Sequence, residues 1–179
     1  MIRLILIYGA IAGVIVAVPM VVLMLTLTEE TAPDNGALYG YLTMIVALTT
    51  VFLGIKHYRD KMLGGVIRFW PALAVGLAIS AVAGVIYVIG WEISLASSGF
   101  DFGAAMSKMM VDAARARGAS ELELESVAAQ AAAFARMYEN PLYRLPITFV
   151  EIFPIGVLIS FVSAGLLRNS GLLPARGRA

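Results

Sequence analysis

The sequence predicts an all-α fold: an integral membrane four-helix bundle with an extra-cytoplasmic helical hairpin between the third and fourth membrane spans. Of its 179 residues, 60% are hydrophobic and 14% are charged, whereas a typical soluble domain has about 45–50% apolar and about 25% charged residues. The apolar residues gather in four blocks, each close to the roughly 20 residues with which a helix crosses a bilayer. The sequence lacks the alternating segments of about ten residues that indicate a membrane β-barrel.

The spans are expected at about residues 4–27, 38–55, 69–92 and 145–167, within a single domain that covers residues 1–179. Inside lipid the backbone must form its hydrogen bonds within each segment, so these runs are predicted as helices. The first run follows Arg3 and is longer than the core of a signal peptide, which has about 7–15 residues. It is therefore interpreted as a retained signal anchor.

Basic residues in short loops predict the orientation, because they mark the cytoplasmic side of a membrane. Four of them fall in the expected loop 56–68, Arg3 precedes the first span, and three arginines follow the fourth. The segment 28–37 has three acidic residues and no lysine or arginine. Both termini are thus expected in the cytoplasm. The loop residues expected to attract anionic lipid headgroups are Lys56, Arg59, Lys61 and Arg68.

The outer insertion 94–144 predicts two helices. Residues 101–117 are rich in good helix formers and end at Gly118. Ser120 and Glu123 match a capping box that starts a second helix. Its apolar positions recur every three or four residues: Leu124, Val127, Ala131, Phe134 and Tyr138. The first helix has an apolar stripe of Met106, Met109, Met110 and Ala113. Packing of this stripe on the second helix is favoured over a flexible partner-binding surface.

Rows of small residues predict close contacts between the spanning helices, because such rows let helix backbones approach each other in lipid. Internal packing is the economical interpretation, and a homo-oligomer is the alternative. The residues of these rows expected to pack are Gly9, Gly13, Gly76, Ser80, Gly84, Gly156 and Ser160.

Glu151 is the charged residue inside the fourth apolar run. An acid there costs about 2.5–3.5 kcal/mol on insertion scales and by default indicates function. Pro154 would kink the helix beside it, as in broken-helix binding sites. With Glu92, at the outer end of the third span, Glu151 could bind a cation, share a proton or hold an arginine. A structural salt bridge with Arg144, or a hydrogen bond with Thr148, is favoured over function because buried charges are usually paired.

Several function classes are excluded or disfavoured by composition. The chain has no cysteine, one histidine and a net charge of +1. Cysteine nucleophiles and cysteine metal sites are therefore excluded, and no basic surface indicates nucleic-acid binding. The single histidine, His57, is interpreted as a solvated side chain. Hydrolase and phosphate-loop motifs are missing from the sequence as well. We expect a protein that is not an enzyme and that has no cofactor.

An ordered set of residues resembles the signature of the bacterial family known as domain of unknown function 4199, over nearly the whole chain. The residues that carry the resemblance are Gly54, Lys56, Tyr58, Arg59, Asp60, Gly64, Gly65, Ile67, Phe69, Gly76, Tyr87, Trp91, Glu92, Asn140, Pro141, Thr148, Glu151, Pro154, Gly156, Ser160 and Arg168. The resemblance implies a small multi-pass protein of the bacterial inner membrane. It implies no activity, and it places Glu92 and Glu151 among the motif positions.

The sequence favours a non-enzymatic accessory, assembly or scaffolding subunit. Its expected partners are membrane lipids, a second copy or another subunit of a membrane complex. The alternative is a small transporter or ion-binding protein that uses Glu92 and Glu151. An intramembrane enzyme with a glutamate-only site ranks last.

Overall fold

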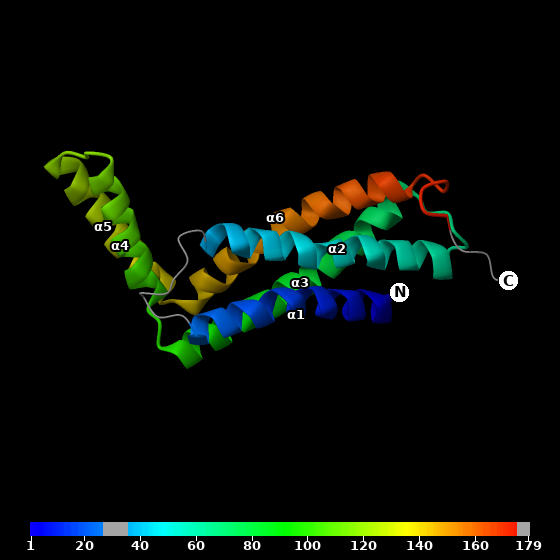
Figure 1. Ribbon diagram of the computed structural model, residues 1–179, viewed down its shortest axis with the longest axis horizontal. Coiled ribbons are helices and arrows are strands. Elements are labelled where there is room, and N and C mark those ends of the chain that lie inside the picture. Colours follow the sequence, from blue (N-terminus) through cyan, green and yellow to red (C-terminus); the bar gives the residue numbers. More distant parts are fainter. Residues whose placement is uncertain (27–35, 175–179) are drawn as a thin grey trace. The chain divides into compact units, whose positions relative to one another are not determined.

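The computed structural model describes residues 1–26 and 36–174, which confirm the all-helical class and contain no strand. Most of the acidic segment 28–37, and the arginines at 176 and 178, lie outside the described residues. Figure 1 shows the helices that these residues form: α1 (Ile2–Thr26), α2 (Gly36–Met62), α3 (Phe69–Ser98), α4 (Phe102–Ala116), α5 (Glu121–Tyr138) and α6 (Pro141–Leu167).

Among the described residues, four helices are long and apolar enough to cross a membrane. The candidate spans are Ile2–Val22, Gly40–Met62, Phe69–Ser98 and Pro141–Leu167, which belong to α1, α2, α3 and α6. This finding supports a membrane protein with four spans. The chain also divides into two compact units. The span unit comprises the described residues of 1–94 and 149–174, and the insertion unit comprises residues 95–148.

Three span helices extend beyond the expected bounds, and α3 continues to Ser98 instead of ending at residue 92. The second span continues to Met62 instead of ending at residue 55, because Lys56, Arg59, Lys61 and Met62 are good helix formers. The basic residues predicted in a loop are therefore largely helical. Gly64 and Gly65 then take φ angles of 70° and 96°, which glycine adopts without strain. Helix α6 begins at Pro141, a residue favoured in the first turn of a helix, and continues through Pro154.

Glycines bring α1 and α3 close together in the span unit. A Cβ atom added to Gly9 would lie 2.5 Å from the Cβ of Val82, and one added to Gly13 would lie 2.6 Å from the Cβ of Ile86. Both distances are shorter than the roughly 3.5–4.0 Å of a normal carbon contact. Only glycine permits this approach at the two positions.

Helices α3 and α6 contact each other through a reciprocal pair of small residues. A Cβ on Gly76 would lie 2.8 Å from the Cβ of Ser160, and a Cβ on Gly156 would lie 2.6 Å from the Cβ of Ser80. The two serine hydroxyl oxygens are 3.3 Å apart. The hydroxyl of Ser160 also lies 2.7 Å from the carbonyl oxygen of Gly156, to which it donates. Each glycine of one helix thus faces a serine of the other. Gly84 on α3 meets a phenylalanine of α6 in the same way, since its added Cβ would lie 2.7 Å from a ring carbon of Phe149.

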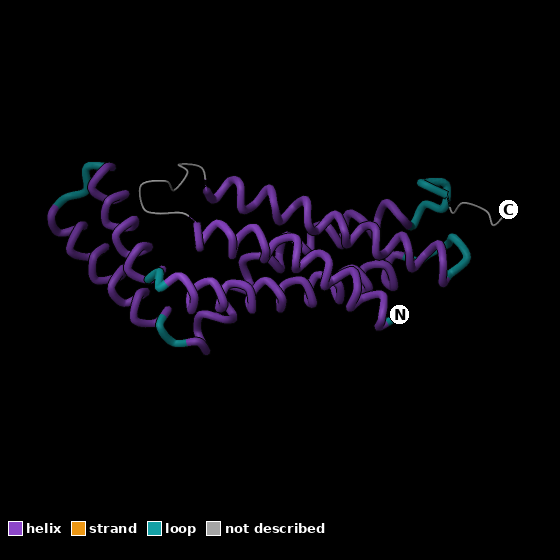
Figure 2. Tube along the Cα trace, turned by 60° about the horizontal axis from the view of Figure 1, so that its bottom comes forward, coloured by secondary structure: helices purple, strands orange, loops and turns teal. Residues whose placement is uncertain are grey.

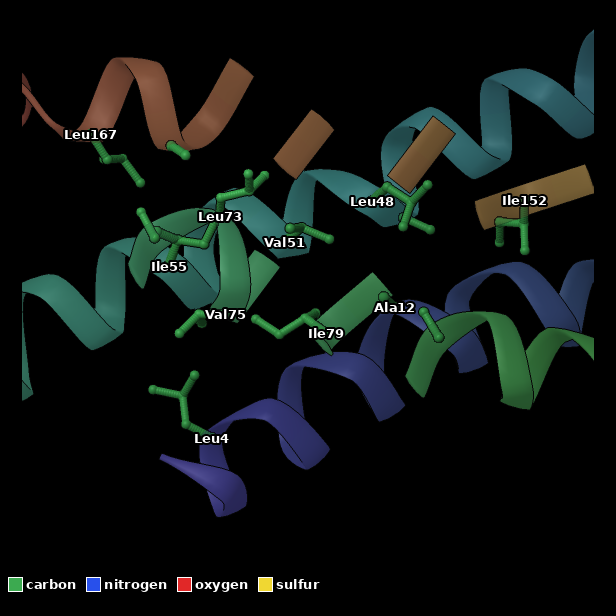
Figure 3. Packing of buried hydrophobic residues seen from close by; sticks show 14 of the residues in the cluster. Leu4, Ala12, Leu48, Val51, Ile55, Leu73, Val75, Ile79, Ile152 and Leu167 are labelled. Carbon is green, nitrogen blue, oxygen red and sulfur yellow. The ribbon is translucent and has the colours of Figure 1, made fainter. Parts of the chain in front are cut away.

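All four span helices contribute to one buried apolar cluster, which Figure 3 shows at close range. Helix α2 supplies Leu48, Val51 and Ile55, each at most 1% exposed. Ile79 of α3 and Ala12 of α1 are completely buried in the same cluster. Large apolar side chains elsewhere on these helices are exposed. Such a distribution suits helices that face each other on one side and lipid on the other.

In the insertion unit, α4 and α5 lie side by side (Figures 1 and 2). Gly103 lies opposite Ala135, and the hydroxyl of Ser107 donates to the carbonyl oxygen of Ala131 at 2.7 Å. The residue numbers of these contacts rise along α4 while they fall along α5, so the two helices run antiparallel. The predicted capping box at Ser120 is present.

The contact face of α4 matches the predicted methionine stripe only in part. Met109 is 58% exposed and Ala113 is exposed, whereas Gly103 and Ala114 are buried. Small side chains allow the two helices to approach closely, so the row that contains glycine, serine and alanine faces α5. Met106 and Met110 of the predicted stripe are half-buried, so the stripe overlaps this face in part.

Candidate functional site

Glu151 and Tyr87 form a polar contact between two candidate spans, and we call this pair the Glu151 site. The hydroxyl of Tyr87 on α3 donates to Oε2 of Glu151 on α6 at 3.2 Å. Tyr87 is 5% exposed, whereas Glu151 is exposed. Glu151 lies ten residues after Pro141, the first residue of α6, or roughly 15 Å along the helix. The carboxylate is therefore at the surface of a helix that can cross a membrane.

The carboxylate of Glu151 has no cationic partner in the described span unit: no lysine, arginine or histidine nitrogen of that unit lies within 4.0 Å of it. A neutral hydroxyl offsets only part of the cost of removing a carboxylate from water. An acid in a spanning segment costs about 2.5–3.5 kcal/mol on insertion scales. Lipid alone is thus a poor environment for the exposed side of Glu151.

The other residues predicted for this site have neighbours of their own. Arg144 donates from Nη1 to the carbonyl oxygens of Tyr138 at 3.1 Å and Glu139 at 3.5 Å. The hydroxyl of Thr148 donates to the carbonyl oxygen of Arg144 at 3.0 Å. All of these contacts lie within the insertion unit. Glu92 is half-buried on α3.

Tyr87 is the residue of the Glu151 site that was not predicted as part of it. It precedes Glu151 by 64 residues, so no local spacing connects the two. Its place in the family signature was the available signal. A buried tyrosine hydroxyl generally needs a hydrogen-bond partner, and the position of Tyr87 inside an apolar run leaves few candidates besides the acids.

A second polar feature is the Arg59 cluster, formed by Lys56, Arg59 and Asp60 near the end of α2. Arg59 is completely buried. Among the described residues it is the largest side chain that is fully buried. Its Nε donates to Oδ1 of Asp60 at 2.7 Å. Nζ of Lys56 lies 2.5 Å from the other oxygen of Asp60. The aspartate therefore joins two cations, one of them fully enclosed by protein.

This geometry corrects the prediction for Arg59. It was expected to contact lipid headgroups from a loop, but it lies on α2 and none of its side chain is exposed. Charge patterning alone cannot distinguish a solvated arginine from one that binds backbone carbonyl groups. Lys61 and Arg68 are exposed, so they remain candidates for headgroup contacts. His57 is exposed, as expected, and its Nδ1 also lies 3.0 Å from the hydroxyl of Tyr8 on α1.

The insertion unit has a pocket of about 310 Å³, and the residues that line it include Asp101, Phe102, Tyr138 and Arg144. Two of the charged side chains that line this pocket already have hydrogen-bond partners. Asp101 accepts from the backbone N–H of Ala104 at 2.9 Å, and Arg144 donates to backbone carbonyls. Across the described part of the chain, no group of three or more histidine, cysteine or acidic residues could hold a metal ion.

The described helices define the structural class of the protein: it is all-helical and has four candidate membrane spans. A family model described as "Protein of unknown function (DUF4199)" matches residues 7–169. The chain therefore belongs to this family, as the resemblance in its sequence predicted. No curated protein and no solved structure matches the chain.

Proposed function

We propose that this chain is a non-enzymatic accessory subunit of a membrane complex, and that the Glu151 site contacts another subunit. The supporting observation is the exposed carboxylate of Glu151 on a candidate span, with a tyrosine hydroxyl as its neighbour in the span unit. Acids inside membrane spans generally face other protein groups or water rather than lipid. A second protein that covers Glu151 satisfies this requirement.

The partner is a membrane helix that presents a basic side chain. An arginine or lysine would neutralise the carboxylate and provide the charge-assisted hydrogen bonds that lipid lacks. The span unit of a second copy in the same orientation would not supply it. Arg59 contacts Leu167, which is sixteen residues after Glu151, or roughly 24 Å along α6. The other basic residues described in the span unit are near this end: Arg3, Lys56, Lys61, Arg68 and Arg168.

The same basic residues support an orientation in which this end of the span unit is cytoplasmic. We place the chain in the bacterial inner membrane, with its four spans as a bundle, both termini inside the cytoplasm and the α4–α5 pair outside. The absence of cysteine makes this orientation easy to test, because a single introduced cysteine is the sole target of a membrane-impermeant maleimide.

Site-specific photocrosslinking in intact membranes tests the partner. Benzoylphenylalanine replaces Val150, next to Glu151, or Val46 on α2, and both valines are 62% exposed. We expect a protein adduct from position 150 and no such adduct from position 46. The variant Glu151→Gln should reduce the adduct at least tenfold, because coupling between close charge pairs is worth about 1.5–7 kcal/mol.

The variant Glu125→Gln is the matched control, because Glu125 is an exposed acid of α5 and its loss should leave the adduct unchanged. Mass spectrometry of the adduct should identify a different membrane protein with a basic residue in a span. An adduct of two copies of the 19.1 kDa chain would replace the proposed partner with self-association. An adduct that does not respond to Glu151→Gln would show that Glu151 is not the contact.

A further inference from the structure

The chain after α6 folds back onto the buried guanidinium of Arg59. Helix α6 ends at Leu167, and we call residues 168–173 the strap. Nη1 of Arg59 donates to the carbonyl oxygen of Leu172 at 2.9 Å, and Nη2 donates to that of Leu173 at 2.5 Å. The carbonyl oxygen of Leu167 lies 3.5 Å from Nη1. One side chain of α2 thus binds both the end of α6 and the segment that follows it.

The remaining hydrogen bonds of the strap's described backbone are local. The N–H groups of Arg168 and Asn169 donate to carbonyls in the last turns of α6. Gly171 and Leu172 donate to oxygens of Asn169. Residues 168–171 are exposed. Within the described residues, the hydrogen bonds that join the strap to a distant part of the chain therefore come from Arg59.

The strap also contains a strained residue. Leu173 has a φ of 49° and is 51% exposed. Residues other than glycine rarely adopt this left-handed conformation, because the Cβ then crowds the following carbonyl oxygen. The carbonyl oxygen of Leu173 accepts the short hydrogen bond from Nη2 of Arg59. Strain of this kind persists where surrounding contacts fix the backbone, and this hydrogen bond is such a contact.

We infer that Arg59 is a latch that holds the strap against the C-terminal ends of α2 and α6. When the hydrogen bonds of Arg59 to the strap are lost, the strap opens and the spans stay folded. The latch requires the planar guanidinium. Three separate nitrogens bind Asp60, Leu172 and Leu173, whereas the single ammonium of a lysine cannot reach three acceptors in these directions. Asp60 holds the guanidinium in place and is itself paired with Lys56.

Hydrogen exchange and limited trypsin digestion of the purified chain in detergent test the latch. In Arg59→Lys, the backbone amides of Gly171 and Leu172 should exchange at least tenfold faster. Trypsin should also cleave after Arg168 at least tenfold faster. Exchange in the rest of α6 and in α3 should stay within twofold of the parent. Arg68→Lys, at an exposed arginine, is the matched control and should change neither measurement.

A second variant keeps the test decisive if Arg59→Lys does not fold. Asp60→Asn retains the guanidinium and a neutral oxygen acceptor but removes the charge that orients it. The strap should therefore exchange about three- to tenfold faster, which corresponds to the difference between a charged and a neutral hydrogen bond. Unchanged protection of the strap in the folded variants would overturn the inference. Equal acceleration across α2, α3, α6 and the strap would also overturn it, because Arg59 would then stabilise the spans as a whole.

Discussion

Replacing Gly156 with alanine should weaken the contact between α3 and α6. The added Cβ would lie 2.6 Å from the Cβ of Ser80 and 2.8 Å from its Oγ, whereas carbon atoms in contact are about 3.5–4.0 Å apart. The helices must therefore separate by about 1 Å at this point. The separation also lengthens the 3.3 Å contact between the hydroxyls of Ser80 and Ser160. Overpacking of a tight contact costs about 1–3 kcal/mol.

Gly165 provides the matched control on the same helix, since it is exposed and an added Cβ meets no atom within 4 Å. Both alanine variants gain the same helix propensity, about 0.8–1.0 kcal/mol in water. The difference between their free energies of unfolding therefore isolates the steric overlap. Reversible unfolding by sodium dodecyl sulfate in mixed micelles, followed by circular dichroism, measures it. Gly156→Ala should be about 1–3 kcal/mol less stable than Gly165→Ala. Equal stability of the two variants would refute the close contact.

Three further predictions follow from other parts of the molecule. Tyr87→Phe keeps the ring but removes the hydroxyl that donates to Glu151, so the free energy of unfolding, measured in the same micelles, should fall by about 0.5–1.5 kcal/mol. Ser107→Ala removes the donor to the carbonyl oxygen of Ala131, and hydrogen exchange of α5 should accelerate about fivefold, equivalent to roughly 1 kcal/mol; unchanged exchange would contradict the α4–α5 contact. In intact cells, an impermeant maleimide should label Ser126→Cys but not Lys61→Cys, and the reverse pattern would invert the proposed orientation.

The spans could be predicted because their signal is local. A run of about 20 apolar residues has few structures available to it in lipid, so the membrane class and the approximate spans follow from sequence order alone. The bounds were less predictable where polar residues continue a helix. Lys56 to Lys61 were expected in a loop because they are charged, yet they extend α2 to Met62. Charge ends an apolar run without ending a helix.

The polar contacts were harder to predict because their partners are distant in the sequence or belong to the backbone. Tyr87 and Glu151 are 64 residues apart. Arg59 binds carbonyl oxygens more than 100 residues away, at three leucines whose side chains carry no signal of this role. A carbonyl acceptor is present at every residue, so the pattern of residue types cannot reveal which one an arginine will bind.

The two polar features of the span unit differ in where the partners of their charged groups are found. Arg59 is enclosed by an aspartate and by backbone carbonyls, all within this chain, and none of its surface is exposed. Its hydrogen bonds to distant residues go to the end of α6 and to the strap, so we expect the effect of its loss there. Glu151 is exposed on a span and meets a single neutral donor in the span unit. Under the proposed function, its charge is compensated by a basic side chain of another subunit. For this reason Glu151→Gln should alter association far more than it alters the stability of the isolated chain, whereas Arg59→Lys should release the strap and leave association unchanged.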